Sequence, residues 1–178
     1  AGVVEQESGV TFPEEVEKRQ LVATGVRKKY GAVKVYAVAL YLAKDSKLWG
    51  KAPDAERLQK EAHRGAALRL VITSGLVTQA KLAAALKESV QPRLEALGCK
   101  DVDGVMEMFM EVFDEAPPLK KFAVITFTLV KDGVQVAFDK RPPVIVHSPE
   151  LARALLATYV DAKAVSPAFR DAILRALA

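Results

Sequence analysis

Two long apolar runs separated by a short turn constrain the fold of this chain more than any other feature. The first run extends from about Gln20 to Lys28 and the second from about Val33 to Leu42, with Tyr30 and Gly31 between them. Runs of this length and composition, joined by so few residues, predict two paired antiparallel strands. The chain is therefore expected to contain an antiparallel sheet.

The remaining pattern adds further strands and several helices. Strands are predicted over 66–73, 122–130, 134–138 and 143–147, and "GVTFP" at 9–13 is expected to form a short edge strand. Helices are predicted from Asp54, from Thr78, from Asp101 or Asp103, and after the cap and proline pairs Ser148–Pro149 and Ser166–Pro167. Hairpins rather than regular βαβ units favour an α+β fold.

Length and composition exclude several classes of protein. A chain of 178 residues is long enough for one domain, expected over 9–178, after a polar and flexible segment at 1–8. The net charge of +4 is spread along the chain, so nucleic acid is not an expected partner. No apolar run reaches the length of about 18 residues that a membrane helix needs, and a soluble monomer is expected.

Metal and redox sites are not expected. Cys99 is the single cysteine, so neither an intramolecular disulfide nor a CxxC motif is possible. His63 and His147 have no carboxylate or thiol at the spacing of metal ligands. The sequence therefore predicts no metal and no cofactor.

Arg27 and Tyr36 are the residues of the hairpin that suggest a ligand. With Tyr30 and Gly31 at the centre of the turn, Gly25 pairs with Tyr36, and Arg27 lies diagonally from Tyr36 on the same face. That face continues with Val38, Leu40 and Leu42. A guanidinium and a phenol beside an apolar floor suit a carboxylate with a hydrocarbon tail.

Other interpretations of these residues stay open at this point. Arg27 near a strand end is equally compatible with a solvent-exposed side chain, and Tyr36 with an ordinary core residue. A turn one residue longer would place the two side chains on opposite faces of the sheet. Pattern alone favours the structural roles.

Two segments resemble the chalcone isomerase superfamily. The hairpin "TGVRKKYGAVKVYAVALYL" is similar to the corresponding hairpin of that family, and "ATYVDAKAVSPAFRDAIL" (157–174) to its C-terminal helical segment. The similarity runs from about Gly9 to the end of the chain. It implies an open-faced β-sandwich, in which helices cover a large antiparallel sheet and a ligand cleft lies between the two layers.

The resemblance also implies roles for individual residues. Arg27 matches the arginine that lies near the substrate's attacking oxygen in the isomerases and binds the carboxylate in the fatty-acid binders. Tyr36 matches the fatty-acid binders, since true isomerases have threonine there. The tyrosine, lysine and asparagine of the isomerase helix align with Leu82, Ala85 and Ser89, and Thr158 and Tyr159 match a pocket-lining pair.

These observations predict a protein that binds a long-chain fatty acid, or a similar lipophilic carboxylate, without catalysis. The expected ligand-binding residues are Arg27, Tyr36, Val38, Leu82, Leu86, Met106, Phe109, Thr158 and Tyr159. Methionines at 106, 108 and 110 with Phe109 and Phe113 are suited to an acyl tunnel, although core packing is the commoner role.

Two alternatives remain: a weakly active chalcone isomerase, and an auxiliary protein that acts through a partner enzyme. The resemblance implies the plastid stroma as the compartment. A targeting segment removed before Ala1 would not be visible in the chain.

Overall fold

The computed structural model describes residues 2–29, 33–61, 63 and 65–178. Strands β1 (Gly2–Val4) and β2 (Thr11–Pro13) form a small antiparallel sheet of their own. The large sheet is antiparallel throughout, and its spatial order follows the chain from β3 to β9. Its strands are β3 (Glu15–Val16), β4 (Arg19–Lys29), β5 (Val33–Ala43), β6 (Ala67–Ile72), β7 (Val124–Val130), β8 (Gly133–Phe138) and β9 (Val144–Val146).

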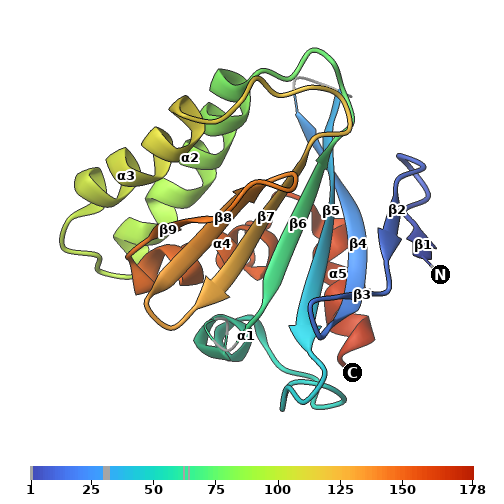
Figure 1. The fold of residues 1–178 in the computed structure, drawn as a ribbon. Coiled ribbons are helices and arrows are strands. Elements are labelled where there is room, and N and C mark those ends of the chain that lie inside the picture. Colours follow the sequence, from blue (N-terminus) through green and yellow to red (C-terminus); the bar gives the residue numbers. More distant parts are fainter. Residues whose placement is uncertain (1, 30–32, 62, 64) are drawn as a thin grey trace.

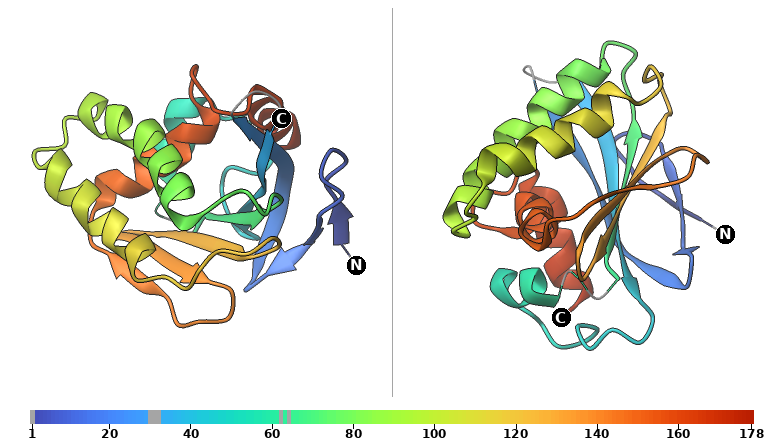
Figure 2. Two further views of the ribbon diagram at one scale, coloured as in Figure 1. Left: turned by 90° about the horizontal axis from the view of Figure 1, so that it is seen from above. Right: turned by 60° about the vertical axis from the view of Figure 1, so that its left-hand side comes forward.

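Helices cover one face of this sheet. They are α1 (Ala55–Glu61), α2 (Gln79–Ala96), α3 (Val102–Asp114), α4 (Pro149–Val160) and α5 (Pro167–Ala176). Figures 1 and 2 show α2 to α5 on one side of the sheet, while the β1–β2 hairpin lies on the other side. The predicted α+β open-faced sandwich, with helices over an antiparallel sheet, is confirmed.

The alternation of side chains along β5 separates two apolar clusters. Tyr36, Val38, Leu40 and Leu42 belong to the main core, which also contains the buried residues of the helices. The intervening Ala37, Ala39 and Tyr41 face the other side, where Phe12 of β2 packs against them. Since both faces of β5 are buried, the strand is apolar at nearly every position.

Capping side chains position the helices as the sequence predicts. Thr78, Asp101, Ser148 and Ser166 each accept a hydrogen bond from a backbone N–H in the first turn of α2, α3, α4 and α5, respectively. Asp101, and not Asp103, is thus the cap of α3. Pro92 lies inside α2, and the helix continues beyond it to Ala96.

The N-terminal residues have contacts that their polar sequence did not predict. The short strand predicted at "GVTFP" is β2, which ends at Pro13 and pairs with β1 in a separate two-stranded sheet. The Lys28 Nζ atom lies 2.8 Å from a carboxylate oxygen of Glu7, and the Lys34 Nζ atom donates to the Glu7 carbonyl at 2.7 Å. Residues 2–8 are thereby connected to the central hairpin.

The register of the hairpin differs from the prediction. Arg27 lies directly opposite Tyr36 and Gly25 opposite Val38, because Lys29 pairs with Val33 and the ladder shifts by one further residue between Arg27 and Lys28. Lys34, two residues before Tyr36, is exposed and donates to the Glu7 carbonyl. The predicted turn centre, Tyr30 and Gly31, lies outside the described residues.

Gly25 has a different role from the one its predicted pairing suggested. A Cβ atom at Gly25 would lie 2.5 Å from the Cβ and 2.8 Å from the Cγ of Phe169. Phe169 is fully buried in α5, so Gly25 permits the close approach of this helix to β4, rather than making room for the Tyr36 ring.

We therefore expect Gly25→Ala to destabilise the protein by about 1–3 kcal/mol, because the added methyl group must displace α5. Urea denaturation measures the difference. Gly75→Ala is the matched control, since a Cβ atom there has no neighbour within 4 Å and its backbone needs no positive φ. Equal free energies of unfolding for the two variants would contradict this role of Gly25.

Candidate functional site

Arg27 is the buried charged residue at the centre of the candidate site. Its side chain is 4% exposed, although it lies two residues before the end of β4. The guanidinium lies 5.9 Å from the centre of the Tyr36 ring, measured from Cζ. The directly opposed positions of Arg27 and Tyr36 on β4 and β5 bring the two side chains together beneath the helices.

The hydrogen bonds of Arg27 connect the sheet to α2. Nη1 donates to the Tyr36 hydroxyl at 3.3 Å, and Nη2 donates to the Ser89 hydroxyl at 2.9 Å and to the Ala85 carbonyl at 3.4 Å. The Ser89 hydroxyl in turn donates to the Ala85 carbonyl at 3.1 Å. The guanidinium is therefore bound by oxygens of two side chains and one backbone group.

Tyr159 of α4 extends this network. Its hydroxyl lies 2.7 Å from that of Tyr36, and both side chains are fully buried. Burial raises the pKa of the Tyr159 phenol well above its usual value, and the neighbouring Tyr36 adds to this increase, while Arg27 opposes it. Tyr159 is thus a neutral group at the end of a chain of hydrogen bonds that begins at a cation.

Among the described residues, no carboxylate forms an ion pair with Arg27. Glu88, next to Ser89 in α2, is exposed and pairs with Lys29. Burial lowers the pKa of Arg27, but the neighbouring Tyr36 and Tyr159 and the charge of Glu88 more than offset this effect, so the pKa of Arg27 is raised.

This arrangement is chemically suited to an anion. A buried guanidinium normally pairs with a carboxylate or phosphate, whose oxygens accept two N–H groups at once. Here its partners are neutral oxygens, and two phenols beside it can also donate hydrogen bonds. A carboxylate entering the site would meet the charged guanidinium and one phenol O–H, since the other phenol hydrogen is used between Tyr36 and Tyr159.

The other predicted site residues surround this network as packed core. Val38, Leu82, Leu86, Met106 and Phe109 are at most 3% exposed, and all belong to the cluster between sheet and helices. Thr158 is fully buried, but its hydroxyl donates to the Ala154 carbonyl of its own helix at 2.9 Å. The hydroxyl of Thr158 is thus engaged within α4.

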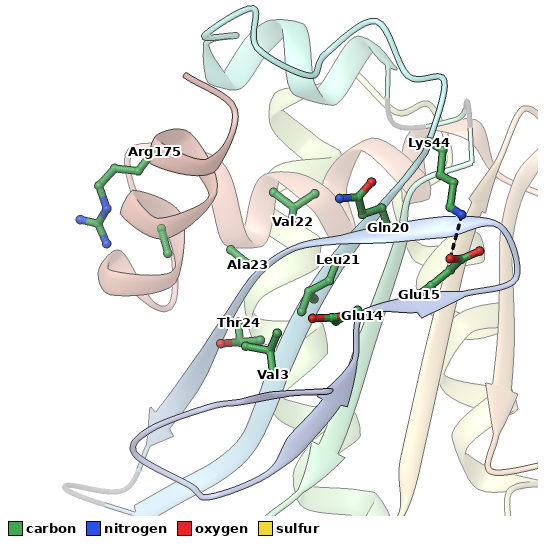
Figure 3. Close-up of a pocket in the computed structure, with 11 residues that line it drawn as sticks. Val3, Glu14, Glu15, Gln20, Leu21, Val22, Ala23, Thr24, Lys44 and Arg175 are labelled. Atoms are coloured by element: carbon green, nitrogen blue, oxygen red, sulfur yellow. Dashed lines mark ion pairs between the residues drawn. The ribbon is translucent and has the colours of Figure 1, made fainter. Parts of the chain in front are cut away.

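The ligand cleft predicted between sheet and helices coincides with neither of two pockets at the surface of the described residues. A pocket of about 660 Å³ lies at the outer edge of β4, where Leu21 to Thr24 are flanked by Val3 and by Arg175 of α5 (Figure 3). Met106 borders a second pocket of about 470 Å³, formed with charged residues of α2 and α3. None of the other predicted site residues borders either pocket.

Sequence reasoning missed one partner of Arg27. Ser89 aligns with a polar residue of the isomerase helix that this chain lacks, yet its hydroxyl forms the shortest of the hydrogen bonds to Arg27. The available signal was a serine on the face of α2 that carries Leu82, Leu86 and Val90. A hydroxyl at a buried position of an amphipathic helix requires a partner.

The fold and the buried arginine define a class of protein in which helices enclose a polar centre against an antiparallel sheet. The chain belongs to the chalcone isomerase-like family, whose sequence model matches residues 5–175. Its structure is similar to the crystal structure of a fatty-acid binding protein of Arabidopsis thaliana, with a TM-score of 0.85 and 23% sequence identity. The match covers 99% of this chain and 98% of the plant protein. A search of curated protein sequences gives no significant match.

The described part of the chain contains neither a cluster of metal ligands nor a membrane-spanning helix. Within that part of the chain, no group of three or more histidine, cysteine or acidic residues is placed to hold a metal ion. None of the helices described has the length and hydropathy to cross a bilayer.

The raised pKa of Tyr159 predicts how stability changes with pH. Because a phenol in the unfolded chain has a pKa of about 10, the folded protein keeps a proton that the unfolded chain loses above this pH. The contribution of Tyr159 to the free energy of unfolding is therefore complete below about pH 10 and decreases above it, by up to about 1.4 kcal/mol per pH unit.

Chemical denaturation at about pH 8 and about pH 11 measures this decrease on both sides of the phenol's ordinary pKa. Tyr159→Phe should show a smaller decrease than the parent protein. Burial also raises the pKa of Tyr41, to about 12. Because Tyr41 is present in both proteins, its effect on stability cancels in the comparison. Identical decreases in the two proteins would show that Tyr159 titrates normally.

Proposed function

We propose that this protein binds a long-chain fatty acid, or a similar lipophilic carboxylate, between the sheet and the helices without chemically changing it. The observation that carries the proposal is the buried guanidinium of Arg27, whose hydrogen-bond partners are the hydroxyls of Tyr36 and Ser89 and one carbonyl. A carboxylate would give this cation the charged partner that its protein contacts do not provide.

The surroundings of Arg27 favour a hydrocarbon tail. Val38 of β5, Leu82 and Leu86 of α2, and Met106 and Phe109 of α3 belong to the apolar cluster on the same side of the sheet. Because these side chains are closely packed, an acyl chain must displace some of them as it enters. Methionine is adaptable in shape, so Met106 is suited to accommodate such a change.

The family relationship supports the same proposal. The similar Arabidopsis thaliana structure is described as a fatty-acid binding protein. Tyr36 also agrees with the binding branch of the family, where the isomerases have threonine. Leu82 and Ala85 place hydrocarbon side chains where the isomerases have groups that polarise the substrate. These positions favour binding over catalysis.

We extend the proposal to the oligomeric state of the protein and to its cellular compartment. A monomer with one domain over 9–178 suffices, because Arg27, Tyr36, Ser89 and Tyr159 all come from the same chain. The family resemblance favours the plastid stroma.

Substitution of the two proposed carboxylate ligands tests the function. Arg27→Ala should nearly abolish fatty-acid binding, because loss of a charge-assisted partner in a closed site costs about 2–5 kcal/mol. Tyr36→Phe should only weaken binding, since one hydrogen bond to a charged group is worth about 1.5–3 kcal/mol. Calorimetric titration with fatty acids of several chain lengths measures both losses.

Two controls make this experiment specific. Lys28→Ala removes a neighbouring cation that is exposed and paired with Glu7, and it should leave fatty-acid affinity unchanged. A fatty-acid methyl ester should bind the parent protein poorly and respond little to Arg27→Ala. Thermal melting shows whether each variant folds, and equal acid affinity in folded Arg27→Ala and the parent would refute the proposal.

Substitution of Ser89 is expected to increase fatty-acid affinity rather than reduce it. A carboxylate that binds Nη2 of Arg27 competes with the Ser89 hydroxyl and the Ala85 carbonyl, which both accept from this atom. Ser89→Ala removes one competitor, so fatty-acid affinity should increase by a factor of about 2–10, the equivalent of one ordinary hydrogen bond. A loss of affinity in the same titration would instead make Ser89 a direct ligand of the carboxylate.

A further inference from the structure

Two apolar side chains project from adjacent loops at one end of the sheet. Leu76, between β6 and α2, is 70% exposed, and Phe122, just before β7, is 62% exposed. They are the most exposed large hydrophobic residues among those that the structure describes. Figures 1 and 2 show the two loops close together at the upper end of the sheet.

Backbone hydrogen bonds hold these loops to each other. The Phe122 N–H donates to the Ile72 carbonyl at 2.7 Å, and the Ile72 N–H donates to the Ala123 carbonyl at 3.0 Å. These bonds attach the start of the Leu76 loop to the end of the Phe122 loop. The two apolar side chains are thus presented from one connected piece of backbone.

The backbone conformation of Phe122 is itself unusual. Its φ of +72° lies in the left-handed region, which bulky residues rarely adopt and in which glycine has no steric cost. A strained backbone and an exposed aromatic ring do not stabilise the fold, so stability alone does not explain a phenylalanine at this position. Such strain frequently marks a functional position.

The charged residues within the two loop segments are all basic. Lys120 and Lys121 precede Phe122, and the Lys121 Nζ atom lies 5.2 Å from the centre of the Phe122 ring. On the other loop, Lys81 Nζ donates to the Leu76 carbonyl at 3.3 Å. Segments 73–81 and 116–123 contain no acidic residue. None of the ion pairs recorded between described residues involves these lysines.

We propose that this basic apolar tip, consisting of Leu76, Lys81, Lys120, Lys121 and Phe122, docks on the surface of a lipid bilayer that contains anionic lipids. Lysines next to isolated apolar side chains match the two layers of a bilayer surface, the charged headgroups and the acyl chains below them. Stable protein interfaces instead have a broad apolar centre with few charges. Projecting side chains with lysines around them fit a bilayer better.

This inference does not depend on fatty-acid binding by Arg27. Bilayer docking is measured without a soluble ligand, and none of the five residues of the tip contacts the Arg27 network. The two proposals can therefore fail separately. If both proposals hold, the protein docks on the bilayer into which its lipophilic carboxylate partitions.

Flotation with vesicles tests the docking. We expect binding to phosphatidylcholine vesicles to increase with added phosphatidylglycerol and to decrease with salt, because each lysine near an anionic surface contributes about a fivefold factor in affinity. Equal binding to neutral and anionic vesicles, or no binding to either, would overturn the proposal.

Phe122→Gly separates docking from folding. Glycine adopts a φ of +72° freely, so the variant should remain folded by thermal melting, while its vesicle affinity should fall at least about tenfold with loss of the ring. Leu76→Ser provides the same test without the unusual backbone. Met108→Ser, at a side chain of α3 that is 42% exposed, should leave vesicle binding unchanged.

A matched pair of double variants tests the charges. Lys120→Ala with Lys121→Ala should weaken binding to anionic vesicles and reduce its dependence on salt. Lys47→Ala with Lys51→Ala removes the same charge from the loop before α1, at the other end of β5, and should leave binding unchanged. Equal losses in both pairs would indicate general charge attraction and overturn the proposal. Light scattering provides a second check of Phe122→Gly. A changed oligomeric state in this variant, with vesicle binding unchanged, would also overturn the proposal.

Discussion

The burial of one guanidinium determines how the layers of this protein meet. A charged side chain removed from water must find hydrogen-bond partners, and Arg27 finds them on β5 and α2. Through Tyr36 the network reaches Tyr159 of α4, so one polar group connects the central hairpin to two helices. The apolar cluster around it then fills the space between sheet and helices.

The partners of this guanidinium also connect structure with function. A structural arginine in a core is usually neutralised by a carboxylate, because an unpaired buried charge is costly. Arg27 has neutral partners within the described residues, and its positive charge is thus available to an anion that comes from outside. The chain belongs to the chalcone isomerase-like family, which agrees with this interpretation of Arg27. The choice between catalysis and binding depends on the side chains of α2.

The part of the site that could be predicted from sequence lies within the hairpin. Alternation along two paired strands placed Arg27 and Tyr36 on a common face, even though the pairing was wrong, because a shift by two residues preserves the face. One residue of this shift comes from the pairing of Lys29 with Val33 and the other from the irregularity between Arg27 and Lys28, which has no sequence signal of its own. The roles of Ser89 and Gly25 could not be predicted either, since each is set by a residue of another element.

The sequence by itself determined the local structure of this protein. The alternation of β5, the turn at 131–133 and the capping residues Ser148 and Ser166 depend on neighbours within a few positions, and the elements formed as these signals predict. Only the tertiary structure decided which groups surround Arg27. Ser89 is 62 residues from Arg27, and Tyr159 is 123 residues from Tyr36. Contacts over such separations depend on how α2 and α4 pack across the sheet, and packing is a property of the whole core.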